Sequence, residues 1–112
     1  MYFDYLRERE PDLLFLRKEG GFAVYKYVIF RNTQAVYIQD IYVEKSQRHT
    51  GLASELSEEI QEMAKNGGVD WLLGTVCPSA KDSHISLKVL IAHGMTLYNS
   101  TEDLIWFYKE IK

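Results

Sequence analysis

The stretch AVYIQDIYVEKSQRHTGLASELSEEIQEMAKN, from Ala35 to Asn66, predicts a strand, a tight turn and an amphipathic helix. Residues 36–43 are rich in β-branched and aromatic side chains, which is typical of a strand. After the turn, apolar side chains recur with a helical period, at Leu52, Leu56, Ile60 and Met63, with Ala53 and Ala64 beside them. Asn66-Gly67-Gly68 is expected to end the helix, because Asn and Gly tolerate the left-handed conformation common at helix C-termini.

The turn between this strand and helix contains Arg48-His49-Thr50-Gly51-Leu52-Ala53, which fits the pattern Arg/Gln-x-x-Gly-x-Gly/Ala. The first N–H groups of a helix have no partners within it and carry partial positive charge. Gly51 has no side chain, so a bulky anion can approach these groups, and Arg48 adds a permanent cation. The turn therefore suits a phosphate or pyrophosphate, although a purely structural turn explains the local pattern equally well. The motifs GxxxxGK[ST] and GxGxxG do not occur in the sequence.

Two segments resemble the GNAT superfamily of acetyl-CoA-dependent N-acetyltransferases. QDIYVEKSQRHTGLASELSEEIQEMA, residues 39–64, resembles the signature strand, pyrophosphate loop and helix of that family. VDWLLGTVCPSAKDSHISLKVLIAHGM, residues 69–95, resembles the family's next strand and helix, which customarily end in Gly-Phe and here end in Gly94-Met95. The resemblance extends from about Leu13 to the C-terminus and implies that the cofactor is acetyl-CoA (coenzyme A).

The resemblance assigns the cofactor contacts by position. The backbone of Ile41, Tyr42 and Val43 would hydrogen-bond the pantetheine arm as an added strand does. The pyrophosphate would be held by the backbone amides of Arg48, His49, Thr50, Gly51, Leu52 and Ala53. The imidazole of His49 is a further candidate phosphate contact.

Two positions depart from the family pattern. Ser83 falls where the family often has an Asn that helps to hold the cofactor, and Ser can still donate a hydrogen bond. Leu90 falls where many members have a Tyr that protonates the departing thiolate, and Leu cannot act as an acid. The resemblance therefore leaves two functions open. One is an N-acetyltransferase that moves an acetyl group directly to a primary amine; the other is a catalytically weak or inactive GNAT-like CoA-binding or interaction module.

Candidate catalytic residues follow from the same placement. Asp40 is the carboxylate on the signature strand nearest the expected transfer site, and it would accept the amine proton directly or through water. His84 begins the predicted second helix, where a helix N-terminus favours the neutral imidazole, so it would serve as donor or base. The alternatives to these catalytic roles are that Asp40 only contributes to packing and that His84 is only an exposed side chain. The histidines and Cys77 are too widely spaced for a metal site.

The remaining segments predict the rest of the fold. Strands are expected at residues 13–18, 22–30, 69–76, 95–98 and 104–111, with a turn at 31–34 and a short helix at 2–10. A second main helix is expected from Asp82 or Ser83 to His93. The order β-β-β-α-β-α-β-β predicts an α/β (α+β) domain of GNAT type. Its sheet is mixed and mostly antiparallel, with about six strands and two main helices.

Composition narrows the functional classes. The 112 residues, 46% hydrophobic and 13% aromatic, suffice for one domain with a packed core spanning residues 1–112. The net charge of -3 argues against a nucleic-acid partner, and no apolar run approaches the roughly 20 residues that span a bilayer. A single cysteine and the lack of a signal peptide lead us to expect a cytoplasmic protein.

The N-terminus appears short beside the resembled family. The sequence lacks the strand and full helix pair that the family usually places there and that often wall the acceptor pocket. We therefore expect an acceptor pocket that is open or covered by a second subunit, which makes a homodimer possible. The acceptor, a small-molecule or peptide amine, is left open by the sequence.

Overall fold

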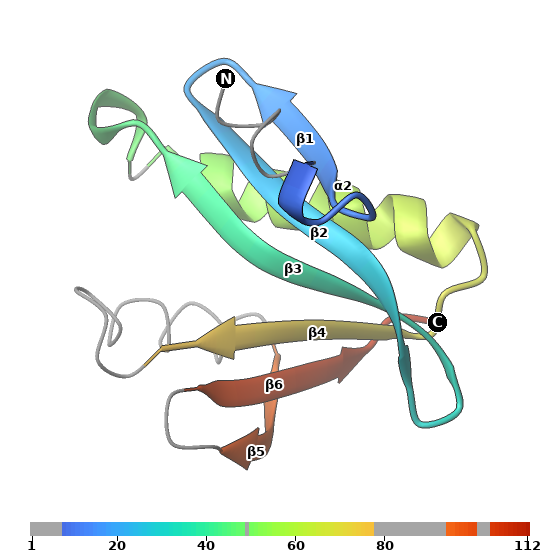
Figure 1. Cartoon of the computed structure of the whole chain (residues 1–112). Coiled ribbons are helices and arrows are strands. Elements are labelled where there is room, and N and C mark those ends of the chain that lie inside the picture. Colours follow the sequence, from blue (N-terminus) through green and yellow to red (C-terminus); the bar gives the residue numbers. More distant parts are fainter. Residues whose placement is uncertain (1–7, 49, 78–93, 101–103) are drawn as a thin grey trace.

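The computed structural model describes residues 8–48, 50–77, 94–100 and 104–112. Six strands form one sheet in the order β1-β2-β3-β4-β6-β5 (Figure 1). The bounds are β1 Leu14–Lys18, β2 Gly21–Phe30, β3 Thr33–Val43, β4 Trp71–Val76, β5 Thr96–Ser100 and β6 Ile105–Glu110. A short 3₁₀ helix, η1 (Lys45–Gln47), and the helix α2 (Leu52–Asn66) connect β3 to β4. Strands β3 and β4 are parallel, and the other neighbouring strands are antiparallel.

The mixed, mostly antiparallel six-stranded sheet confirms the predicted sheet, but the helix count needs correction. The described residues contain one main helix, α2, so the expectation of two main helices is not borne out by them. The expected second helix, ending at His93, lies outside the described residues. Of the short helix expected at residues 2–10, Glu8 and Arg9 are helical, and residues 1–7 are not described. No helix among the described residues is long and apolar enough to cross a bilayer.

The turn between β2 and β3 is shorter than the predicted turn at residues 31–34. Arg31 and Asn32 have φ angles of 51° and 65°, a left-handed pair that forms a tight hairpin turn. Residues 33 and 34 therefore already belong to β3. Asn adopts this conformation readily and Arg does so rarely. The guanidinium of Arg31 lies over three aromatic rings at 4.6–5.2 Å, those of Phe30, Trp71 and Tyr108.

Helix α2 packs on one face of the sheet, behind β1, β2 and β3 in Figure 1. Its buried residues recur at every fourth position, namely Leu52, Leu56, Ile60 and Ala64. The sequence pattern predicted that Met63 belongs to the buried face, but Met63 is 41% exposed. The buried residues are spaced by four, so Ala64 rather than Met63 faces the sheet. The core on this side includes the buried Ala23, Val36 and Leu72.

The opposite face of the sheet carries a second apolar cluster. Phe30, Ala35 and Leu73 are buried there, and further side chains pack against them, namely Val28, Tyr37, Trp71 and Tyr108. Both apolar faces of the long strand β2 are therefore used in packing. The two faces differ in character, because the face away from α2 is dominated by aromatic rings.

We expect Leu56→Ala to lower the free energy of unfolding by about 2–5 kcal/mol, because Leu56 is fully buried between α2 and the sheet. Met63→Ala, on the same helix but 41% exposed, is the control and should change it by about 0.5 kcal/mol or less. Urea unfolding measures both. Equal losses would contradict the assignment of the buried face of α2.

Candidate functional site

Strands β3 and β4 separate partway along their length. Their pairing ends where Ile38 opposes Gly74. Beyond this point β3 continues through residues 39–43, bonded to β2 on its other side, and Figure 1 shows β3 and β4 diverging. Within the described part of the chain, no strand pairs with this stretch of β3 on the β4 side. An unpaired strand edge presents backbone N–H and C=O groups to an extended ligand.

A β-bulge sits where the two strands begin to separate. Tyr25 opposes Ile38, whereas the preceding residue, Val24, opposes Asp40, so Gln39 is an extra residue in β3. Because of this insertion, Ile38 and Ile41 both pack into the core beneath α2 despite their odd spacing. Bulges beside active sites commonly redirect a side chain in this way.

The bulge decides which face Asp40 occupies. Ile41 and Val43 pack beneath α2, so strand alternation places Asp40 and Tyr42 on the opposite face. Tyr42 is 45% exposed there, and its ring centroid lies 5.5 Å from that of Phe22. Asp40 and Tyr42 therefore share the face of the sheet away from α2.

The Asp40 carboxylate has a perturbed acidity. Asp40 is exposed as a residue, but the groups around its carboxylate withdraw it from water, and this desolvation raises the pKa of Asp40. A hydrogen bond from the backbone of Ile41 lowers the pKa and offsets part of this shift. A carboxylate with a raised pKa accepts a proton more readily than an ordinary one, which suits a general base.

The loop after β3 is fixed to the turn between β1 and β2. The backbone N–H of Glu44 donates to the carbonyl of Gly20 at 2.7 Å. A Cβ atom added to Gly20 would lie 2.5 Å from Cγ of Gln47, so only glycine lets η1 approach this turn. The contact of Gly20 with Gln47 is a long-range requirement that local sequence patterns do not reveal.

Two side chains brace the loop itself. Nε of Arg48 donates to the carbonyl of Val43 at 3.2 Å, which ties the loop to the end of β3. The hydroxyl of Thr50 donates to the carbonyl of Gln47 at 2.5 Å and so closes the loop. Arg48 remains exposed, so its charge stays at the surface beside the helix start.

Gly51 precedes the first turn of α2 and is its N-cap residue. Its φ of 87° and ψ of 5° are left-handed, and no side chain of the described residues caps the helix. The carbonyl of Gly51 accepts the N–H of Glu55 at 3.0 Å, as the first bond of the helix. A Cβ atom built on Gly51 meets nothing within 4 Å. Space for an anion therefore lies beside the first backbone amides of α2, which fits the residues to a diphosphate.

An acidic side chain in the first turn of α2, Glu55, forms an ion pair with Lys18. Glu55 would compete with a bound anion for the positive helix end. Nζ of Lys18 lies 3.2 Å from Glu55 and 2.7 Å from Glu59. Hydrogen bonds to Glu59 and then Glu55 raise the pKa of Lys18, so Lys18 keeps its charge.

The structure brings most of the predicted site residues together. The edge at residues 41–43 and the loop at residues 48 and 50–53 lie at the same end of the sheet, because Arg48 bonds to Val43. Leu52 and Ala53 begin α2, where Leu52 is buried with 8% exposure. His49, Ser83, His84 and Leu90 lie outside the described residues, so their roles stay predictions.

Three features of this region were missed in the sequence. They are the bulge at Gln39, the close approach at Gly20, and a hydrogen bond of 2.9 Å between the hydroxyls of Tyr37 and Thr75. One feature of the sequence indicates the bulge. Ile38 and Ile41 are both apolar but three positions apart, whereas residues on one face of a regular strand are an even number of positions apart.

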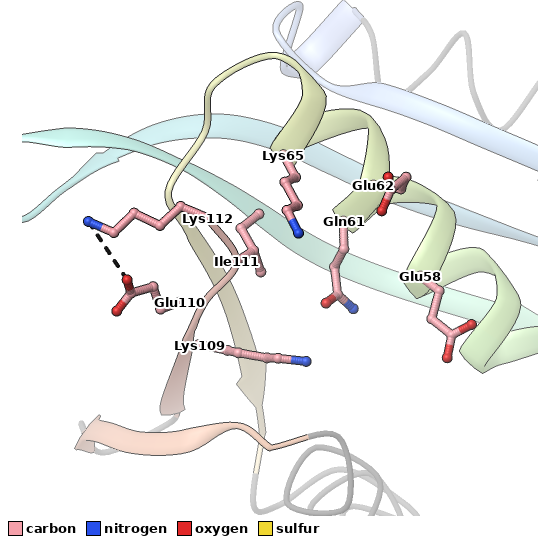
Figure 2. A pocket seen from close by; sticks show the side chains of 8 residues that line it. All are labelled: Glu58, Gln61, Glu62, Lys65, Lys109, Glu110, Ile111 and Lys112. Carbon is pink, nitrogen blue, oxygen red and sulfur yellow. Dashed lines mark ion pairs between the residues drawn. The ribbon is translucent and has the colours of Figure 1, made fainter.

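A hollow of about 500 Å³ lies elsewhere, between α2 and the end of β6. Figure 2 shows lysine and glutamate side chains lining it from both elements. Lys112 and Glu110 form an ion pair of 3.7 Å there. Lys65, in the last turn of α2, also lines it, so this hollow is remote from Gly51. Its mixed charge does not favour a polyanion.

The family is shown by comparison with protein-family models. The model described as "Acetyltransferase (GNAT) family" matches residues 2–84. That match covers most of the chain, and a parallel β-α-β unit with an uncapped helix start is present within it. The chain therefore belongs to the GNAT acetyltransferase family. Comparison with curated protein sequences gives no match.

Solved structures with the same fold are similar at low sequence identity. The PaiA N-acetyltransferase from Thermoplasma acidophilum, in complex with coenzyme A, has a TM-score of 0.74 and 16% identity, over 96% of this chain and 67% of that chain. A GNAT family acetyltransferase from Elizabethkingia anophelis, with acetyl-CoA bound, has a TM-score of 0.74 and 14% identity, over 96% and 82%. The NatC complex bound to Gag peptide and CoA has a TM-score of 0.72 and 17% identity, over 99% and 79%. These similarities establish the fold.

The raised pKa of Asp40 predicts a pH-dependent effect of Asp40→Asn on stability. The folded state holds the Asp40 proton more tightly than the unfolded state, so wild-type stability falls as the pH rises from about 3.9 through the folded pKa. Asn does not titrate and does not lose stability in this way. The free energy of unfolding of the variant should therefore rise relative to that of the wild type as the pH passes through this range. Urea unfolding as a function of pH measures this difference. A difference that is constant, or that shrinks as pH rises, would contradict the desolvation of Asp40.

Proposed function

We propose that this chain binds acetyl-CoA and transfers the acetyl group directly to a primary amine. The observation that carries the proposal is the uncapped start of α2 at Gly51, with empty space beside it, next to the unpaired edge of β3. Membership of the GNAT family and the bound coenzyme A or acetyl-CoA of two structural neighbours support the same cofactor.

Each part of the site has a separate task in binding. The first backbone amides of α2, with those of the loop from Arg48, hold the diphosphate by hydrogen bonds and by the partial positive charge of the helix end. The backbone of residues 41–43 bonds the pantetheine arm along the free edge of β3. Because Arg48 is anchored to Val43, the loop and the edge keep a fixed relation to each other.

When bound, acetyl-CoA supplies an acetyl thioester, whose C–S bond breaks as the amine nitrogen forms the new C–N bond. The protein's main contribution is alignment, which supplies about 7–11 kcal/mol in favourable cases. Asp40, with its raised pKa, takes the amine proton directly or through a water. We propose His84 as a further donor or base, and Ser83 and His49 as further cofactor contacts.

A GNAT-like module that binds CoA without turnover is the second candidate. Leu90 at the family's usual Tyr position favours it, because a leucine cannot protonate the leaving thiolate. A thiol-release assay across a panel of amines separates the two functions. Release of CoA with any amine supports the transferase, and cofactor binding with no release on every amine supports the module.

For cofactor binding, we expect Gly51→Glu to weaken the affinity for acetyl-CoA at least about tenfold, equivalent to about 1.4 kcal/mol. The added carboxylate occupies the space beside Gly51 and repels the diphosphate. Gly68→Glu is a matched control: Gly68 also has a positive φ (84°) and open space around it, but it follows the other end of α2. Calorimetry measures both variants. Equal weakening by the two variants would count against the diphosphate site.

For catalysis, we expect Asp40→Asn to lower kcat by about 10²–10⁴-fold, the usual contribution of a general base. The affinity for acetyl-CoA should stay unchanged, because Asp40 lies on the face opposite the core beneath α2. In the wild type, kcat should fall as the pH drops and Asp40 becomes protonated. Unchanged kcat in the variant would remove Asp40 from the mechanism and leave His84 or water as the base.

A further inference from the structure

A pocket of about 370 Å³ lies on the sheet face that carries Asp40, the face away from α2. Its apolar and aromatic lining includes Val28, Phe30, Tyr37, Leu73, Tyr98 and Trp106. The volume is near the lower end of the range for small-molecule sites, about 300–1,000 Å³. A ligand of this size has one ring or a short branched chain rather than a long polymer.

The pocket begins where β3 and β4 separate. Tyr37 immediately precedes Ile38, the last residue of β3 that pairs with β4. The hydroxyl of Tyr37 is 2.9 Å from that of Thr75 on β4. Trp106, on β6, lies opposite Thr75 in the sheet. Asp40 follows Tyr37 on the same face of β3, roughly 10 Å farther along the strand. The pocket and Asp40 therefore lie on the same face of the sheet, close to the point where β3 and β4 separate.

The lining selects by ring stacking and by charge. The rings of Tyr37 and Trp106 lie 5.3 Å apart with an interplanar angle of 36°, and those of Phe30 and Tyr98 lie 5.0 Å apart, edge to face. The charged residue among the described lining residues is Lys26, and no carboxylate is among them. Lys26 lies 3.6 Å from Glu10, outside the pocket lining. A second ammonium group on a ligand would meet the like charge of Lys26 and, among the described lining residues, no carboxylate.

From this arrangement we infer that the acceptor is a monoamine whose primary amine is attached to an aromatic or branched aliphatic group, and that Trp106 and Lys26 determine this specificity. The inference rests on the proposed acetyl transfer. The amine nitrogen forms the C–N bond as the thioester C–S bond breaks. The proton that the nitrogen loses goes to Asp40 or water, and the released thiolate takes a proton from solvent.

The test compares kcat/KM for 2-phenylethylamine and for 1,4-diaminobutane with acetyl-CoA present. We expect at least about tenfold preference for phenylethylamine, because the diamine brings a second charge to Lys26 and has no ring to stack. A peptide with N-terminal phenylalanine is tested as a third substrate. If it is acetylated faster than phenylethylamine, the pocket accepts the N-terminal residue of a protein rather than a free amine. Preference for the diamine would overturn the inference while leaving the acetyltransferase intact.

Variants assign the preference to residues. Trp106→Ala should lower kcat/KM for phenylethylamine roughly tenfold without changing the affinity for acetyl-CoA, whereas Trp106→Phe, which keeps a ring, should retain most of it. Leu97→Ala is the control, because Leu97 is 60% exposed on β5 and does not line the pocket. Lys26→Gln should raise kcat/KM for the diamine about fivefold, since Glu10 then lacks its cation. Unchanged ratios in both pocket variants would contradict the assignment.

Binding is measurable even if no amine turns over. The chain has two tryptophans, and Trp106 lines the pocket whereas Trp71 does not. In the presence of CoA, titration with phenylethylamine should shift the indole N–H resonance of Trp106 much more than that of Trp71. Such a shift without turnover supports binding of the amine in the pocket and contradicts the proposed acetyl transfer. No shift of Trp106 at saturating amine overturns the inference.

Discussion

The pairing of β3 with β4 stops at Ile38 and Gly74, and the rest of the site depends on that interruption. Had the two strands stayed bonded to their ends, the backbone groups of residues 41–43 would be satisfied within the sheet. The parallel connection through α2 places a helix start beside the strand that is released. One break in a ladder thus produces an unpaired edge and, next to it, a set of uncapped amides.

The bulge at Gln39 gives the two faces of the sheet separate tasks. Residues beyond the bulge keep their apolar side chains beneath α2, while Asp40 moves to the aromatic face. In the proposal, backbone atoms make the main contacts with the diphosphate and the pantetheine arm, and Ser83 and His49 are further contacts. The acceptor contacts that we infer are side chains on the other face, where Tyr37 and Trp106 line the pocket. Acceptor specificity is therefore free to vary without disturbing cofactor binding.

The sequence predicted the features that short-range chemistry determines. The helix from Leu52 to Asn66 matches its predicted bounds, because the apolar period and the terminal glycines are local signals. The order of the strands along the chain followed in the same way. A turn was predicted at residues 31–34, but its shorter, left-handed form at Arg31 and Asn32 was not, since that conformation is accompanied by cation–π contacts of Arg31 with distant rings.

Long-range geometry is what the sequence could not supply. The bulge depends on the register between two strands, and the need for glycine at position 20 depends on Gln47, which is far along the chain. The pocket on the aromatic face draws residues from β2, β3, β4, β5 and β6, and no single segment carries its pattern. The position of Asp40 in the resembled strand suggested it as a candidate base, but the face on which it lies depends on the register between β2 and β3.

A crystal structure of the chain with coenzyme A tests the central claim most directly. We expect the diphosphate within hydrogen-bond distance of the backbone amides of Gly51, Leu52 and Ala53, and the pantetheine arm along the free edge at residues 41–43. A diphosphate bound instead among the lysines of the hollow between α2 and β6, or a β3 edge covered by the protein's own backbone, would contradict it.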